Sequence, residues 1–591
     1  MDALLDTPTP NATGAPRLHV HPVHPATPDA QWWRTAVVYQ VYPRSFADSD
    51  GDGVGDLPGI TARLGHLVDL GVDAVWLSPF YRSPQVDGGY DVADYRAIDP
   101  VFGTLDDFDA MLGRAHSLGL RVIIDLVPNH TSDEHAWFRE ALAAAPGSPA
   151  RGRYVFRPGR GATGELPPNN WHSIFGGPAW TRTTDPDGTP GEWYLHLFDT
   201  RQPDLDWGNP EVHAEFESVL RFWLDRGVDG FRVDVAHGLV KAEGLPDWDG
   251  VTSMVEGSRS DGSGPMFDQE GVHEIYRTWR RVLDTYPGER ILVAEAWIDA
   301  LPRIARYVRD DEMHQAFNFA FLTTPWDANR LRQSVLDSLA ASDAVGAPTT
   351  WVLSNHDVVR HTARLGLTEA GSLPKGIGAG EEQPDTELGL RRARAATLLM
   401  LALPGVSYLY QGEELGLPEH TTMPDEARQD PAWFRTGGAE TGRDGCRVPL
   451  PWEAGAPAHG FSPSGRSWLP QPASFARHAL DAQRGVAGST YELYRQALGL
   501  RRHLALGAGS LDCVDLEGTA PSEAVVLRNG ELVVLTAFGP DPVVLPEGCD
   551  VLLASGSLAT DERGRLLLPP DTTAWVLPAA RHLPRARGAQ G

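Results

Sequence analysis

Short apolar runs alternate with longer stretches of helical periodicity between residues 32 and 416. The runs are bounded by polar loops, which is typical of strands buried on both faces of a parallel sheet. The predicted strands are residues 37–42, 74–78, 122–127, 230–235, 291–296, 350–354 and 407–410, with a weaker candidate at 316–321. The predicted helices are residues 56–70, 105–118, 210–226, 270–285, 327–339 and 388–401. Eight strands alternating with helices favour an α/β fold, a closed (β/α)8 TIM barrel.

Two long segments rich in Gly and Pro interrupt this alternation. One follows the third strand and the other, residues 411–487, follows the eighth; loops of this length are usually functional. Short alternating runs after residue 507 predict an antiparallel β-sandwich domain. The expected organisation is a disordered leader at 1–30, the barrel at 31–130 and 210–506, an inserted subdomain at 131–209, the C-terminal β domain at 507–580 and a tail at 581–591.

The composition is that of a folded globular protein, with 41% hydrophobic and 22% charged residues among 591. Asp and Glu number 79 against 51 Lys and Arg, so the formal net charge is −28. Such a chain is repelled by phosphate backbones and anionic lipid, so we expect no nucleic-acid or membrane partner and a neutral small molecule instead. No secretory leader is recognisable and the three cysteines form no disulfide or zinc pattern, so we expect a cytoplasmic monomer or homodimer.

Carboxylates follow several of the predicted strands at their carboxyl ends. Asp234 closes the fourth strand, Glu295 the fifth, and Asp357 follows the seventh. Barrel enzymes build their active sites at this end of the strands. Because buried charges are costly without a partner or a role, their shared placement indicates a catalytic site.

The residues next to Asp234 and Glu295 in the sequence suggest that these two carboxylates have different roles from each other. Arg232 lies two positions before Asp234, so both side chains share one face of the strand. We expect the guanidinium to lower the pKa of Asp234 and keep it ionised, as a nucleophile requires. Glu295 stands between two alanines and near Trp297, a setting that would raise its pKa and suit a general acid.

These blocks resemble the conserved regions of the α-amylase superfamily, glycoside hydrolase family thirteen, over residues 32–580. The segment Gln202-Pro-Asp-Leu-Asp206-Trp207 is similar to a region of the α-glucosidase and oligo-1,6-glucosidase branch, and Val235-Ala-His237 resembles actinobacterial-type α-glucosidases. The resemblance implies that Asp234 is the nucleophile, Glu295 the acid and then the base, and Asp357 the stabiliser of an oxocarbenium-like transition state.

The resemblance also implies a set of substrate-binding residues. Asp87 and Tyr90 look like a hydroxyl clamp and a stacking platform for the terminal glucose, with Arg447 as the partner of Asp87. Such a clamp closes the pocket behind the first sugar and makes an enzyme exo-acting. The remaining residues expected at this subsite are His130, Phe175, Phe198, Gln202, Arg232 and His356.

An acidic loop follows the first strand and has the spacing of a calcium site. Carboxylates occupy loop positions one, three, five and nine, a glycine occupies six, and a backbone carbonyl is available at seven. The expected ligands are Asp48, Asp50, Asp52, Val54 and Asp56. Gly59 replaces the usual glutamate at position twelve, so we expect a structural Ca²⁺ site of reduced affinity, with Mg²⁺ as the alternative.

The predicted activity is that of a retaining, exo-acting α-glucosidase acting on maltose and short α-glucosides. Asp234 and Glu295 end adjacent strands about 4.8 Å apart, which suits the separation of about 5–5.5 Å in retaining enzymes. The alternatives are an oligo-1,6-glucosidase, which Val235 after the nucleophile favours within the resembled branch, and a sucrose-cleaving or glucosyl-transferring relative, including a trehalose-forming isomerase. A non-catalytic subunit of the same fold would lack carboxylates that this chain has. The Gly/Ser-rich loop at 250–264 is expected to be mobile.

Overall fold

The computed structural model describes residues 18–27, 31–185, 187–250, 264–298, 300–516 and 518–579. The predicted tail at 581–591 and nearly all of the predicted mobile loop at 250–264 lie outside these residues. Among the described helices, none combines the length and the apolar character that crossing a membrane requires.

Eight parallel strands form one sheet in the order β12-β11-β10-β6-β3-β2-β14-β13. Their bounds are β2 Val37–Val41, β3 Ala74–Leu77, β6 Arg121–Leu126, β10 Gly230–Val233, β11 Ile291–Ala294, β12 Gln315–Ala316, β13 Thr350–Val352 and β14 Val406–Tyr410. The hydroxyl of Thr350 in β13 donates to the backbone carbonyl of Ala316 in β12, which links the two ends of the sheet. The predicted (β/α)8 barrel is therefore confirmed.

The long helices of the barrel begin where the sequence provides capping groups. Asp56 caps α2 by accepting from the Gly59 N–H at 2.6 Å, and Thr104 and Asp107 form a capping box at α3. The helices that connect the strands are α2 Leu57–Leu70, α3 Leu105–Ser117, α5 Pro210–Arg226, α6 Val272–Leu283, α7 Leu301–Ile304, α9 Ala328–Asp343, α11 Thr386–Leu401 and α14 Thr490–His503.

The prediction of a strand at 316–321, the weakest of the eight, is wrong over most of its length. β12 ends at Ala316, and α8 (Phe319–Leu322) follows directly. Asn318 caps this helix by accepting from the Phe321 N–H at 3.1 Å. A short apolar run fits a strand and a buried helical turn equally well, and the cap decides between them.

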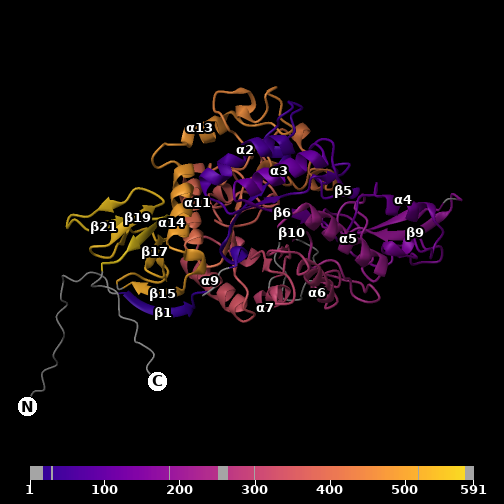
Figure 1. Cartoon of the computed structure of the whole chain (residues 1–591), viewed down its shortest axis with the longest axis horizontal. Helices are drawn as coiled ribbons and strands as arrows, with labels where there is room; N and C mark the ends of the chain where they lie inside the picture. Colours follow the sequence, from indigo (N-terminus) through magenta and orange to yellow (C-terminus); the bar gives the residue numbers. More distant parts are fainter. Residues whose placement is uncertain are drawn as a thin grey trace, which may run out of the picture.

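Excursions from the barrel lie between strand and helix and supply the loops around its carboxyl end. The first holds β4 (Tyr81–Arg82) and β5 (Asp94–Ile98). The second, after β6, holds α4 Ala136–Ala143, β7 Phe156–Arg157, β8 Trp180–Thr184 and β9 Pro190–Leu195. Later loops carry α10 His361–Arg364, α12 Pro431–Arg435 and α13 Leu480–Gln483. Figure 1 shows the β9 excursion at one end of the molecule and the C-terminal sheets at the other, with the barrel between them.

The C-terminal domain consists of two antiparallel sheets. The larger has the order β1-β15-β16-β17-β22-β19, in which β1 is Leu18–His24, and the smaller has the order β18-β21-β20. Their strands are β15 Leu511–Leu516, β16 Ala524–Asn529, β17 Leu532–Ala537, β18 Val543–Val544, β19 Asp550–Ala554, β20 Ala559–Thr560, β21 Leu566–Leu568 and β22 Thr572–Leu577.

Of the disordered leader predicted at 1–30, residues 1–17 and 28–30 lie outside the described part of the chain, and residues 18–24 form a strand. β1 (Leu18–His24) pairs antiparallel with β15 and forms the edge of the larger C-terminal sheet. Figure 1 shows β1 running beside β15. The strand obtains its backbone hydrogen bonds from a partner almost 500 residues later in the chain, so local sequence patterns do not reveal it.

Candidate active site

The predicted carboxylates meet at the carboxyl end of the barrel. Asp234 and Glu295 each follow directly on the end of their strand, and these strands, β10 and β11, are neighbours in register. Asp234 and Asp357 line one cavity together with Asp87. Glu295 is buried beside this cavity and is joined to Asp234 through Arg232.

Arg232 is the central cation of the site. Its Nη1 donates to Asp234 Oδ1 at 2.6 Å and to Asp125 Oδ1 at 2.7 Å, and its Nη2 lies 3.7 Å from Glu295 Oε2. Asp125 is fully buried and also accepts from the Tyr90 hydroxyl at 3.1 Å. One guanidinium therefore fixes three carboxylates, and it cannot be lost without leaving buried charge unpaired.

Asp234 and Glu295 both have raised pKa values, and for Asp234 this is the opposite of the expected direction. Burial raises the pKa of Asp234 well above its ordinary value, and Arg232 opposes this effect without cancelling it. Burial likewise raises the pKa of Glu295, again against Arg232, which agrees with the expectation for a general acid. Because the two carboxyl groups interact, the proton that they retain belongs to the pair, and its position is set by the substrate and by hydrogen bonds.

Two arginines and a histidine keep Asp357 ionised. Arg443 and Arg447 each place a guanidinium nitrogen 3.0 Å from Asp357 Oδ1, and His356 Nε2 lies 3.2 Å from Oδ2. Burial alone would raise the pKa of Asp357, but His356 and the two arginines outweigh it and lower that pKa below its ordinary value. Asp357 is therefore a fixed negative charge facing the cavity.

The ion pair to Asp87 is made by Arg443, and the predicted pairing with Arg447 is wrong. Arg443 Nη2 donates to Asp87 Oδ1 at 2.7 Å, whereas Arg447 donates to Asp357 and, through Nε, to the His356 carbonyl at 2.8 Å. The two arginines stand four residues apart on either side of a short 3₁₀ turn. Spacing in the motif does not show which of them faces Asp87.

The other predicted binding residues gather around the same cavity. Tyr90 stacks on His356 with ring centroids 5.1 Å apart and an interplanar angle of 7°. Gln202 donates to Asp87 Oδ2 at 3.2 Å, and its amide lies 3.2 Å from His130 Nε2. Those that line the cavity wall are Tyr90, His130, Phe175 and Phe198.

Some residues at the site had no predicted role. The sequence places Asp125 among the carboxylates near the ends of the barrel strands without assigning it a function, and Arg443 stands in the same motif as Arg447 and could have been found from its position. Lys375 and Glu440 line the cavity and form an ion pair at 2.8 Å, but they belong to no recognisable motif. The loops that carry them meet only in the folded chain.

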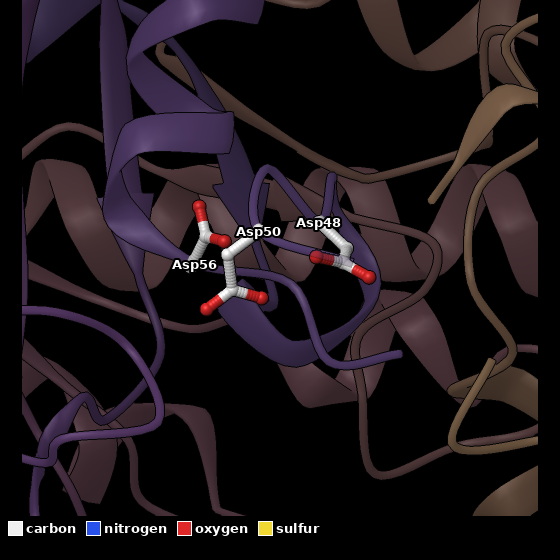
Figure 2. Close-up of side chains that lie close together, drawn as sticks. All are labelled: Asp48, Asp50 and Asp56. Atoms are coloured by element: carbon white, nitrogen blue, oxygen red, sulfur yellow. The ribbon is translucent and has the colours of Figure 1, made fainter. Parts of the chain in front are cut away.

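The acidic loop brings three of its predicted ligands together. Oxygen atoms of Asp48, Asp50 and Asp56 lie within 4.8 Å of one another, and Figure 2 shows the three side chains on the same loop. Asp52 is exposed and is not part of this group; its carboxylate accepts from the Val54 N–H at 2.7 Å. Three carboxylates at this separation form a donor set that a hard divalent cation prefers, so they fit a Ca²⁺ or Mg²⁺ ion.

Comparison with known proteins agrees with this geometry. The family model for the α-amylase catalytic domain matches residues 40–509. The chain therefore belongs to the α-amylase family, and it is a glycoside hydrolase.

Individual relatives extend over most of both chains. A probable α-glucosidase of Rhizobium meliloti is 39% identical, covering 83% of this chain and 86% of the relative. An oligo-1,6-glucosidase of Parageobacillus thermoglucosidasius is 33% identical, with coverages of 86% and 90%. The crystal structure of an α-glucosyl transfer enzyme, XgtA, superimposes with a TM-score of 0.78 at 37% identity, covering 93% of this chain and all of that one.

Proposed function

We propose that the protein is a retaining, exo-acting α-glucosidase that releases α-glucose from the non-reducing end of maltose and short α-glucosides. The observation that carries this proposal is that Asp234 and Asp357 line one cavity and that Arg232 links Asp234 to the buried Glu295. Relatives named α-glucosidase and oligo-1,6-glucosidase support the substrate class.

The chemistry proceeds in two displacements. The Asp234 carboxylate attacks the anomeric carbon while Glu295 gives its proton to the glycosidic oxygen, which leaves as a hydroxyl and produces a glucosyl ester. Water then attacks the same carbon, Glu295 takes a proton from it, and Asp234 leaves as a carboxylate. Asp357, ionised throughout, stabilises the positive charge that develops on the ring in both steps.

The exo-action follows from the inner wall of the cavity. The Arg443–Asp87 ion pair joins a loop after β14 to the loop between β4 and β5. This partly buried charge pair, with Gln202 beside it, offers donors and acceptors for the hydroxyls of a terminal glucose. A chain that continued beyond this glucose would have to displace the pair, so the site accepts chain ends.

A panel of disaccharides tests the proposal and separates the alternatives. Purified enzyme is mixed with maltose, isomaltose, sucrose or trehalose, and the first anomer formed is followed by NMR. Release of α-glucose from maltose supports the proposal; preference for isomaltose favours the oligo-1,6-glucosidase alternative, and new disaccharides favour glucosyl transfer, the activity in the name of XgtA. Release of β-glucose would overturn retention.

We further propose that Asp48, Asp50 and Asp56 hold a structural Ca²⁺ ion, with Mg²⁺ as the alternative. Bound there, the ion would offset most of the negative charge of three carboxylates that otherwise repel one another. Asp56 also caps α2, so the loop and the first barrel helix would be stabilised together. The cytoplasmic location, the monomeric or homodimeric state and the actinobacterial-type sub-branch stay predictions from the sequence.

A further inference from the structure

Val235, directly after Asp234, has a backbone conformation that β-branched residues rarely adopt. Its φ is 46°, in the left-handed region. For a residue of this type such a conformation is an outlier that costs about 1–3 kcal/mol and persists only when the surroundings enforce it. The side chain is 1% exposed, packs in a cluster with Phe175 and Phe198, and reaches the cavity wall. The strain therefore lies beside the reaction centre.

The segment around Val235 runs along Glu295 and contacts it at three points. The Glu295 N–H donates to the Val233 carbonyl at 3.0 Å, and the Ala236 N–H donates to the Glu295 carbonyl at 2.8 Å. Between them, the Val235 N–H donates to the side-chain atom Glu295 Oε2 at 2.8 Å. The regular pairing of β10 with β11 ends at Val233 and Ala294, so this last bond depends on the turn that the chain makes at Val235.

The turn itself is held in place by Gly238. Its N–H donates to the Val235 carbonyl at 2.8 Å, and a Cβ at Gly238 would lie 2.6 Å from Val235 Cγ1. The glycine thus leaves room for the valine side chain while its backbone fixes the valine carbonyl. Packing on one side and this hydrogen bond on the other stabilise the unfavourable φ.

We propose that Val235 is a positioning residue that acts through its backbone: the left-handed conformation aims its N–H at Glu295 Oε2 and so fixes the proton donor relative to Asp234. This inference rests on the proposed function and adds a residue to it. With Oε2 occupied by the N–H, Oε1 is the atom that carries the proton. The hydrogen bond from the Val235 N–H to Glu295 strengthens as Glu295 gives its proton to the leaving oxygen. It weakens as Glu295 takes a proton from water.

Two substitutions separate a backbone role from a side-chain role. If the side chain alone matters, Val235→Ala should be milder than Val235→Gly, because alanine keeps more apolar contact. If the backbone matters, the order reverses, because glycine adopts positive φ freely whereas alanine without the valine packing relaxes out of it. We expect Val235→Gly to keep kcat on maltose within about threefold and Val235→Ala to lower it roughly tenfold or more.

The pH profile provides a readout that a merely structural role would not move. A donor on the carboxylate favours its charged form, so losing the N–H raises the pKa of Glu295. The basic limb of kcat should therefore shift to higher pH in Val235→Ala and stay in place in Val235→Gly. Val235→Asn, which also tolerates positive φ, should behave like the glycine variant.

The inference is overturned if the alanine variant equals or exceeds the glycine variant in kcat and keeps the wild-type basic limb. Circular dichroism and a melting curve confirm that each variant is folded; should Val235→Gly fail to fold, Val235→Asn takes its place in the comparison. The order of these variants is independent of the proposed function, which fails separately if Asp234→Asn releases glucose from maltose at the wild-type rate.

Discussion

Arg443 forms a partly buried ion pair with Asp87, with 2.7 Å between Nη2 and Oδ1. The pair closes the inner end of the cavity, and it carries the proposed exo-action. Truncating one partner of a buried, hydrogen-bonded charge pair costs about 2–5 kcal/mol. We therefore expect Arg443→Ala to lower kcat/KM on maltose by about thirtyfold or more, measured by glucose release.

A double-mutant cycle distinguishes the two arginines. Asp87→Ala combined with Arg443→Ala should cost much less than the sum of the single losses, because either change alone already breaks the pair. Asp87→Ala combined with Arg447→Ala should come closer to additivity, since Arg447 donates to Asp357 and to the His356 carbonyl, whereas the donor to Asp87 is Arg443. Stronger coupling of Asp87 to Arg447 than to Arg443 would contradict the geometry.

Glu295→Gln should affect substrates according to their leaving groups. The variant cannot donate a proton, so maltose, whose sugar leaving group needs one, should lose roughly a hundredfold or more in kcat/KM. An aryl α-glucoside with an acidic phenol needs little protonation and should lose far less in the glucosylation step. Steady-state kinetics on both substrates provide the comparison, and equal losses would remove Glu295 from the acid role.

Activity should follow a bell-shaped pH profile with a basic limb set by Glu295. Burial raises the pKa of Glu295, so the protonated acid persists above the ordinary glutamate range, and activity falls only as pH rises through that raised value. The acid limb reflects protonation of the interacting Asp234–Glu295 pair, and burial displaces it upward as well. In Glu295→Gln, assayed with the aryl glucoside, the basic limb should disappear; its persistence unchanged would assign it to another group.

Binding of Ca²⁺ at the acidic loop should stabilise the fold. A chelator is expected to lower the melting temperature by a few degrees, and added Ca²⁺ to restore it, because a ligand that binds only the folded state stabilises it. Asp50→Asn should abolish this Ca²⁺ response, and Asp52→Asn, outside the group of three, is the matched control that should retain it. A melting temperature that neither chelator nor Ca²⁺ changes would refute the site.

The sequence predicts the barrel well because its strands and helices are local patterns. The strands that carry Asp234 and Glu295 have continuous apolar runs, and the helices have caps such as Asp56. What local patterns miss depends on the folded chain. β1 pairs with a strand at the other end of the sequence, and the choice between Arg443 and Arg447 is made by the turn that separates them.

The pKa values of the site also depend on contacts that form only in the folded chain, so local sequence patterns do not predict them. Arg232 two positions before Asp234 indicates an ion pair, which the structure shows. The sequence does not reveal that Asp125 and Glu295 share this guanidinium, nor how deeply the group is buried. Burial and shared charge therefore reverse the expected direction for the pKa of Asp234.

The central claim is that Asp234 becomes covalently attached to glucose during turnover. The most direct measurement is to trap this ester with a slow substrate, an activated fluorosugar of α-glucose, and to locate the added mass by peptide mass spectrometry. We predict one glucosyl adduct on the peptide that contains Asp234, absent from Asp234→Asn. An adduct on a different carboxylate, or turnover of the fluorosugar with no adduct and with inverted product, would contradict the account.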